Sequence, residues 1–231
     1  MSRRWRAERD RDPYHRMAKE QGYRSRAAYK LKQIDREFGI MGYGMVVLDL
    51  GAAPGGWIQV ASEAVGEAGQ VIGVDIKSIE PFGAANVKLV VGDISQAATR
   101  EEVRKTLRGG IDVLLSDLSP QVSGIWDVDQ FRQLELCSHA LEYAEEFLKP
   151  DGWLVMKVFM GADTEAFLSK LRRRLGFMKL YHPSASRKGS SEMYVVGRRL
   201  RKRTTRPGAS KPLGRPVTVD ELNLSIEGLS S

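Results

Sequence analysis

The chain has 231 residues, of which 42% are hydrophobic and 28% charged, and its formal net charge at pH 7 is +7. This is the composition of an ordinary globular protein and excludes wholesale disorder, while the length favours a single domain with tails. The single cysteine, Cys137, excludes an intramolecular disulfide and a cysteine-rich zinc site.

The sequence carries few signs of a metal or of a membrane. Its three histidines stand far apart, so we expect no structural metal. It has no run of about 18 apolar residues, and its first residues lack the apolar segment of a secretory signal. We therefore expect a cytoplasmic protein with no membrane partner, and we expect it to be a monomer.

The positive charge lies at the two ends of the chain. Residues 1–30 carry a net charge of +6 and residues 198–215 carry +8, whereas residues 31–197 sum to −4. Basic flanks suit a polyanion, because each cation that neutralises a phosphate releases condensed counterions. A solubilising tail would explain either flank alone, but two flanks of the same sign favour a nucleic acid.

The hydrophobic pattern alternates between strands and helices. Short apolar runs predict strands at 45–50, 71–75, 87–93, 111–118, 153–159 and 193–198. Three- and four-residue spacing predicts helices at 25–39, 57–65, 101–108, 131–148 and 164–175. This alternation predicts a doubly wound α/β sheet with helices on both faces. We divide the chain into a basic arm (1–23), a domain (24–199) and a basic, disordered tail (200–231).

Acidic side chains end four of the predicted strands, and they predict a cofactor site. They are Asp49, Asp75, Asp93 and Asp117. In such sheets a ligand binds beyond the carboxyl ends of the strands, where a carboxylate such as Asp75 can accept both hydroxyls of an adenosine ribose. That would suit either NAD or S-adenosylmethionine.

The first turn separates these two cofactors. Its sequence, D-L-G-A-A-P-G-G-W at 49–57, does not have the spacing of a dinucleotide fingerprint, and Pro54 offers no N–H to a pyrophosphate. A sulfonium cofactor has no pyrophosphate, and its positive charge suits a pocket edged by carboxylates. S-adenosylmethionine is therefore the favoured cofactor, and an NAD oxidoreductase is the disfavoured alternative.

Five motifs together resemble one enzyme family. They are R-S-R-A-A-Y-K-L (24–31), D-L-G-A-A-P-G-G-W (49–57), S-D-L-S-P (116–120), V-M-K-V-F (155–159) and S-S-E-M-Y-V-V (190–196). In order and spacing they resemble the FtsJ/RrmJ ribosomal RNA ribose 2′-O-methyltransferases across about residues 24–198. The fourth-strand motif departs slightly, since S-D-M-A-P is more usual there, but Asp117 and Pro120 are kept.

The resemblance implies a fold, a cofactor and its contacts. The fold is the mostly parallel, seven-stranded, Rossmann-like sheet of S-adenosylmethionine-dependent methyltransferases. The implied cofactor contacts are Gly55 and Trp57 in the loop, Asp75 on the ribose, Asp93 near the adenine and Asp117 near the methionine end.

The resemblance also implies a catalytic tetrad, which matches Lys30, Asp117, Lys157 and Glu192. A charged side chain such as Lys157 is costly within an apolar strand unless it is functional or paired. Burial and a second ammonium at Lys30 would favour a neutral Lys157 that could accept a ribose hydroxyl proton, whereas Asp117 and Glu192 would favour the charged form. Whether Lys157 is a general base or an aligner stays open on the sequence.

The implied substrate is a uridine ribose in 23S-type large-subunit rRNA, methylated during ribosome assembly. The expected partner is accordingly RNA, as large-subunit rRNA or a pre-ribosomal particle. Trp5, Tyr14 and Tyr23 among the arginines would suit RNA, and equally the packing of the arm. A tRNA ribose methyltransferase and a non-catalytic RNA-binding assembly factor are the remaining alternatives.

Overall fold

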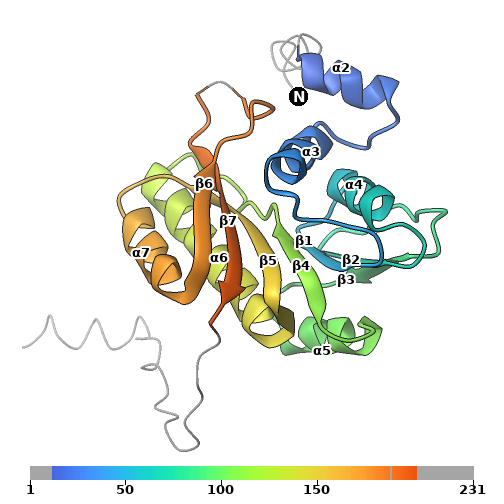
Figure 1. Ribbon diagram of the computed structural model, residues 1–231. Coiled ribbons are helices and arrows are strands. Elements are labelled where there is room, and N and C mark those ends of the chain that lie inside the picture. The colour runs from blue at the N-terminus through green and yellow to red at the C-terminus, as the bar shows by residue number, and fades with distance from the viewer. Residues whose placement is uncertain (1–11, 188, 202–231) are drawn as a thin grey trace, which may run out of the picture.

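The structure is a computed structural model that describes residues 12–187 and 189–201. Its centre is one seven-stranded sheet with the strand order β3-β2-β1-β4-β5-β7-β6 (Figure 1). The strands are β1 (Val46–Leu50), β2 (Gln70–Asp75), β3 (Val87–Val91), β4 (Ile111–Ser116), β5 (Leu148–Phe159), β6 (Leu175–Tyr181) and β7 (Glu192–Leu200). β1 to β5 pair in parallel, whereas β7 is antiparallel to both β5 and β6. The predicted mostly parallel α/β sheet is confirmed.

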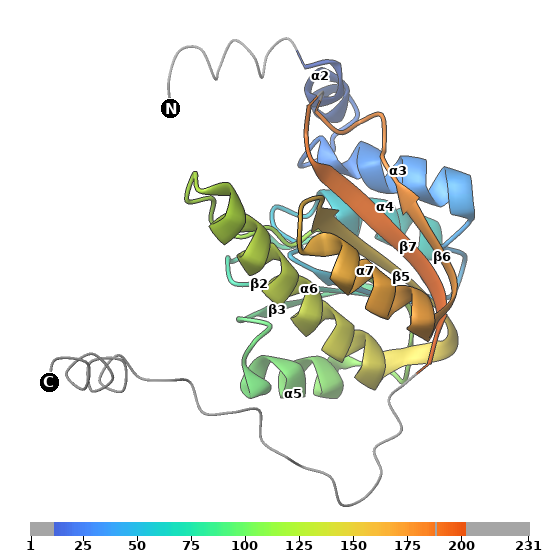
Figure 2. The ribbon, with the colours of Figure 1, turned by 90° about the vertical axis from the view of Figure 1, so that its left-hand side faces the viewer.

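Helices cover both faces of the sheet (Figure 2). The helices are α2 (Pro13–Glu20), α3 (Ala27–Phe38), α4 (Gly56–Val65), α5 (Ala97–Thr106), α6 (Trp126–Phe147) and α7 (Thr164–Arg174). The core on one face combines strand residues with α3 and α4, and the core on the other face combines them with α5, α6 and α7. This two-sided cover is the doubly wound arrangement, and it explains why β1 and β4 are apolar on both of their faces.

Local sequence sets the boundaries of α3 and α4. α3 buries Ala28, Leu31 and Ile34 on one side, as its spacing predicts. It ends at Gly39, whose φ of +60° is the left-handed conformation that glycine adopts most readily. α4 begins directly after Gly55, at φ +111°, where an added Cβ would lie 2.5 Å from the ring of Phe82. The tight first turn therefore requires glycine at this position.

The predicted arm contains a helix that the sequence analysis did not expect. The Asp12 carboxylate accepts the N–H groups of Tyr14 and His15 at the start of α2. The rings of Tyr14 and Tyr23 both pack against Tyr29 of α3, at centroid distances of 5.6 and 5.9 Å. For these two rings the packing interpretation is therefore correct. Trp5, with the rest of residues 1–11, lies outside the described residues, as does the predicted tail from residue 202 onward.

Two further elements differ from the predictions. The edge strand β6 was not predicted, because its sequence interrupts the apolar alternation with Gly176 and Lys179. α6 begins at Trp126 rather than 131 and ends at Phe147, close to the predicted 148, whereas β5 starts at Leu148 rather than at 153. A register shift between Ile111 and Val113 absorbs the additional residues of β5.

The described residues contain no helix that is both long enough and apolar enough to cross a bilayer.

Candidate active site

A cavity of about 400 Å³ lies beyond the carboxyl ends of β1, β2, β3 and β4. Three of the predicted cofactor residues line it: Asp75, which ends β2, and Asp93 and Asp117, which follow β3 and β4. Lys77 is the only cation among the lining residues that the structure describes, so this lining is acidic. The strand order reverses between β1 and β4, the place at which α/β sheets bind ligands.

Backbone hydrogen bonds orient two of these carboxylates. The Asp75 carboxylate accepts the N–H of Ala53 in the first turn at 2.9 Å and that of Lys77 at 2.8 Å. The Asp93 carboxylate accepts the backbone N–H of Ser95 at 2.9 Å, and this bond lowers the pKa of Asp93 below its usual range. Asp93 is thus held as a charged acceptor.

The other two predicted cofactor residues lie outside the lining of this cavity. Gly55 caps the start of α4, and the Trp57 side chain is buried. The Trp57 indole N–H donates to Ala27 O at 2.7 Å, and its ring packs on Tyr194 at a centroid distance of 5.8 Å. The Trp57 ring therefore joins α4 to α3 and β7, so that only the backbone of residues 55–57 could reach a ligand.

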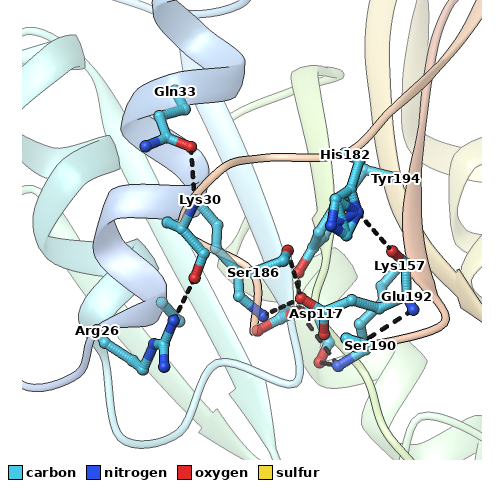
Figure 3. Close-up of polar contacts among 12 residues, drawn as sticks. Arg26, Lys30, Gln33, Asp117, Lys157, His182, Ser186, Ser190, Glu192 and Tyr194 are labelled. Atoms are coloured by element: carbon cyan, nitrogen blue, oxygen red, sulfur yellow. Dashed lines mark hydrogen bonds and ion pairs between the residues drawn. The ribbon is translucent and has the colours of Figure 1, made fainter. Parts of the chain in front are cut away.

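The four residues of the predicted tetrad converge from four elements (Figure 3). The buried Lys157 ammonium donates to Asp117 O at 2.8 Å and lies 3.2 Å from Asp117 Oδ1. Lys30 of α3 places its ammonium 2.6 Å from Glu192 Oε1 at the start of β7. The side chains of Lys157 and Lys30 are 7% and 13% exposed, respectively, so both ion pairs are largely shielded from water.

A second cavity, of about 550 Å³, adjoins this cluster. Ser119 lines both cavities, which makes them neighbours, and Asp117 lines the first. Among the described residues, the charged lining of the second cavity is mostly basic: Arg26, Lys30, Lys157 and Arg187, with Glu192 as the one acid. The tetrad therefore lies where an acidic cavity meets a basic one.

Tyr194 is a buried member of this cluster that the sequence analysis missed. Its hydroxyl donates to Asp117 Oδ1 at 2.7 Å, and Lys30 Nζ lies 5.9 Å from its ring centroid. Burial, reinforced by the nearby Asp117, raises the pKa of Tyr194 well above its usual value. A strand repeats its faces every two residues, so the spacing from Glu192 could have revealed Tyr194.

The segment before β7 holds the Glu192 carboxylate in place. Ser186 Oγ donates to the Oε1 atom of Glu192 that also meets Lys30, at 2.6 Å. Gln33 Oε1 accepts the N–H of Ala185 at 3.0 Å, and the Arg26 guanidinium donates to Ala185 O (Figure 3). α3 thus supplies Lys30 and also fixes the loop that carries its partner.

Asp49 is a fully buried carboxyl whose two oxygens have no hydrogen-bond partner among the described residues. Burial raises the pKa of Asp49 well above its usual range, and the nearby carboxylates of Asp117 and Asp75 raise it further. Both of these neighbours line the first cavity. A positively charged ligand there would relieve this accumulation of acids.

The FtsJ-like methyltransferase family model matches residues 23–200, most of the chain. The chain belongs to this family. The resemblance seen in the five motifs is thereby confirmed, and with it the expectation of a methyltransferase.

Curated relatives and a solved structure agree with this assignment. Ribosomal RNA large subunit methyltransferase E of Methanobrevibacter smithii is 46% identical over 197 residues, which cover 85% of this chain and 94% of the relative. The protein of the same name from Natronomonas pharaonis is 47% identical over 187 residues, covering 81% of this chain and 73% of the relative. A structure from Plasmodium falciparum, described as that of a ribosomal RNA methyltransferase, has a TM-score of 0.69 at 26% identity and covers 78% of this chain and 100% of its own.

Among residues 12–187 and 189–201, no group of three or more His, Cys, Asp or Glu side chains is arranged to hold a metal ion.

Proposed function

We propose that this FtsJ-like methyltransferase transfers a methyl group from S-adenosylmethionine to the ribose 2′-hydroxyl of a uridine in 23S-type large-subunit rRNA during ribosome assembly. One observation carries the proposal. Lys30, Asp117, Lys157 and Glu192 meet at the junction of an acidic cavity of nucleoside size and a basic one. A cationic cofactor suits the first cavity and a polyanionic substrate suits the second.

The residues of the first cavity fit S-adenosylmethionine. Asp75 would accept the ribose hydroxyls, Asp93 would lie near the adenine, and Asp117 near the methionine end. Gly55 and Trp57 would contribute through the backbone at the start of α4, where free N–H groups attract a carboxylate. The unpartnered Asp49 beneath the cavity supports a ligand that carries positive charge.

When bound, S-adenosylmethionine supplies a methyl group on a positively charged sulfur. This chain must then hold a 2′-hydroxyl, a weak nucleophile, in line with that methyl group and move its proton. An ammonium has three N–H positions, and within the described residues Lys157 Nζ donates one hydrogen bond, to Asp117 O, and forms an ion pair with Asp117 Oδ1 at 3.2 Å. An N–H of this ammonium therefore remains available to the hydroxyl oxygen.

The paired carboxylates keep the two lysines in this arrangement. A neutral Lys157 would take the hydroxyl proton, whereas a charged Lys157 would hold the oxygen in line. Lys30, fixed by Glu192, brings a second cation to the same cavity without competing for Asp117. Tyr194, by donating to Asp117, fixes the rotation of that carboxylate.

The substrate assignment rests on the names of the relatives and on charge. The curated relatives are named for large-subunit ribosomal RNA, and the second cavity offers Arg26 and Arg187 to a phosphate. We place the reaction in the cytoplasm, in a monomer whose methyltransferase domain spans 24–199 between a basic arm and a basic tail.

Lys157→Ala tests the proposed function. The protein is incubated with tritiated S-adenosylmethionine and, in parallel, rRNA, tRNA and large subunits from cells that lack the enzyme, and the ribose methylations are mapped. We expect the wild type to label large-subunit RNA and Lys157→Ala to lose about 10²- to 10⁴-fold in rate, the usual contribution of a positioned proton-transfer group. Cofactor affinity, measured by calorimetry with S-adenosylhomocysteine, should remain that of the wild type.

Lys105→Ala is the matched control, because Lys105 is an exposed lysine of α5. An active Lys157→Ala enzyme would contradict the catalytic assignment. Labelling of tRNA alone would contradict the rRNA assignment. If the wild type transferred no methyl group to any of these RNAs, the enzymatic function would be contradicted and a non-catalytic RNA-binding assembly factor would be the remaining alternative.

A further inference from the structure

Apolar side chains are exposed over one short segment beside the two cavities. The ten exposed large hydrophobic residues of the described chain include five within residues 122–131. They are Val122, Ile125, Trp126, Val128 and Phe131. The segment leads from the Ser119–Gln121 stretch, which lines the first cavity, into α6, whose N-terminal end stands clear of the sheet in Figure 2. Such a concentration of apolar surface marks an interaction site.

Trp126 connects this surface to the second cavity. Its ring stacks on Phe159, with centroids 6.1 Å apart and planes inclined by 25°. Phe159 is the last residue of β5 and itself lines the second cavity. Phe159 therefore lines that cavity while its aromatic ring is supported by stacking on Trp126.

The position of Phe159 relative to Lys157 is set by the strand. Residues two apart in a strand face the same side and lie about 7 Å from one another, and both of these line the second cavity. In a nucleoside, the base is attached to the carbon next to the one that bears the 2′-hydroxyl. A hydroxyl held at Lys157 Nζ thus brings its own base within reach of Phe159.

Charge around the cavity favours RNA over a protein as the occupant. Arg26 and Arg187 line the same cavity, and Arg187 is exposed without an acidic partner among the described residues. An aromatic ring next to cations is the combination that binds single-stranded RNA, where unstacked bases lie on rings and phosphates meet arginine or lysine.

We infer that Phe159, braced by Trp126, stacks on the base of the nucleotide whose ribose is methylated, with Arg187 facing its phosphate. The inference rests on the proposed function and adds to it how the nucleotide is held. It requires the target base to be unstacked from its neighbours, because a base within a stack has both faces covered and none free for Phe159. Stacking tolerates any base, so these residues hold the nucleotide without reading its identity.

Three variants and a control test the inference on a large-subunit rRNA transcript. Phe159→Ala should lower kcat/KM by about 5- to 150-fold, the range that one base stacked on an aromatic ring contributes. Phe159→Tyr keeps the ring and should restore most of the activity, while Trp126→Ala should have a smaller effect than Phe159→Ala. Tyr43→Ala is the control, since Tyr43 is 78% exposed and precedes the amino end of β1, whereas the site lies at the carboxyl ends of the parallel strands. Affinity for S-adenosylhomocysteine should be unchanged in all four.

A transcript without a base at the mapped target nucleotide separates stacking from a structural defect. On this abasic RNA, kcat/KM of the wild type should fall by about the same factor as the Phe159→Ala substitution causes on the normal transcript. For the Phe159→Ala enzyme, kcat/KM should fall little further when the base is removed. If Phe159→Ala no longer binds S-adenosylhomocysteine, Phe159→Leu replaces it, because leucine fills the space without offering a ring.

The outcomes distinguish the two proposals. A wild type that methylates no RNA contradicts the proposed function and the inference with it. If the wild type methylates the RNA and Phe159→Ala is fully active, the stacking role alone is overturned. The same follows if removal of the base lowers kcat/KM of the wild type and of Phe159→Ala by the same factor. If Trp126→Ala keeps its activity but changes the molecular mass measured by sedimentation, the exposed apolar surface is a protein interface. This result also overturns the inference.

Discussion

Asp49 shows how a single residue can be unfavourable for the fold and useful for the site. It follows three apolar residues of β1, has no exposed surface, and finds no hydrogen-bond partner among the described residues. A buried polar group without a partner costs stability. Because Asp75 and Asp117 lie nearby at the acidic cavity, a cationic ligand would offset that cost on binding. Asp49 thus lowers the stability of the free protein and favours the binding of a cationic ligand.

Asp49→Asn should therefore stabilise the free protein and weaken its binding of S-adenosylmethionine. The folded-state pKa of Asp49 lies above its unfolded value near 3.8, so the wild type loses stability as the pH rises from about 4 through that folded pKa. Asparagine does not titrate, and the variant's advantage in unfolding free energy should grow over this range by about 1.4 kcal/mol for each pH unit. Urea unfolding at pH 4, 6 and 8 measures it, with calorimetry for the cofactor. An advantage that is the same at all three pH values would contradict the assignment.

The site residues differ in how far the sequence could predict them. Asp75 ends β2 and Asp93 follows β3, so the pattern of predicted parallel strands alone brings both to the carboxyl ends of the strands. Lys30 and Glu192 pair across 162 positions of the chain, and only the family motifs predicted that they belong together. Ser186 was not predicted, because its hydrogen bond to Glu192 depends on the path of the loop before β7, which no local periodicity encodes.

At the scale of elements, the strands buried on both faces were predictable from sequence, and so was the edge strand β3, whereas the edge strand β6 and the helix α2 were not. β1, β2 and β4 are continuous apolar runs because both faces of the sheet are covered there. β6 lies at the edge, where little of its surface is buried, so its sequence carries only a weak pattern. α2 did leave a signal, an Asp N-cap followed by Pro13 in the first turn, but it is only eight residues long and buries only Ala18.

The packing of β2 against α4 leads to a prediction at this scale. An added Cβ at Gly73 would lie 2.4 Å from Ile58 Cδ1 and 3.1 Å from Ala52 Cβ. Since Ile58 is fully buried and its side chain would have to move against its neighbours, Gly73→Ala should destabilise the protein by about 1–3 kcal/mol, the usual cost of overpacking. Gly83→Ala is the matched control, because nothing lies within 4 Å of its added Cβ and its φ is not positive. Chemical denaturation measures both, and equal midpoints would contradict this account of the packing.

For the whole molecule, the direction of β7 completes the active site. β1 to β5 run parallel and bring their carboxyl ends to one edge, whereas β7 runs the opposite way and begins at that edge. Its first residue, Glu192, therefore pairs with Phe159 of β5, two residues from Lys157, and lies within reach of Lys30 of α3. The strand pattern alone predicted a sheet with helices on both faces, but not this antiparallel strand, because direction is set by the hairpin with the unpredicted β6.

The rate at which the thiol of Cys137 is labelled reports on opening of the folded structure. It is the only cysteine, it is buried between α6 and β5, and its Sγ donates to Lys157 O at 3.2 Å. Burial raises the pKa of Cys137 to about 12, so the folded protein holds almost no reactive thiolate at pH 8. We expect no labelling by a disulfide reagent on mixing, and one thiol per chain in guanidinium chloride.

S-adenosylhomocysteine should slow this labelling if the opening that exposes Cys137 also disrupts the cofactor cavity. α6 and β5 lie directly behind the tetrad, so their separation would displace Lys157 and with it Asp117. A ligand that binds only the closed form slows the reaction by one plus the ratio of its concentration to its Kd, or about 100-fold at 100 times the Kd. Labelling rates measured across a ligand titration at pH 8 test this. A rate that does not depend on the ligand would mean that Cys137 becomes exposed by a local opening that leaves the cofactor site intact.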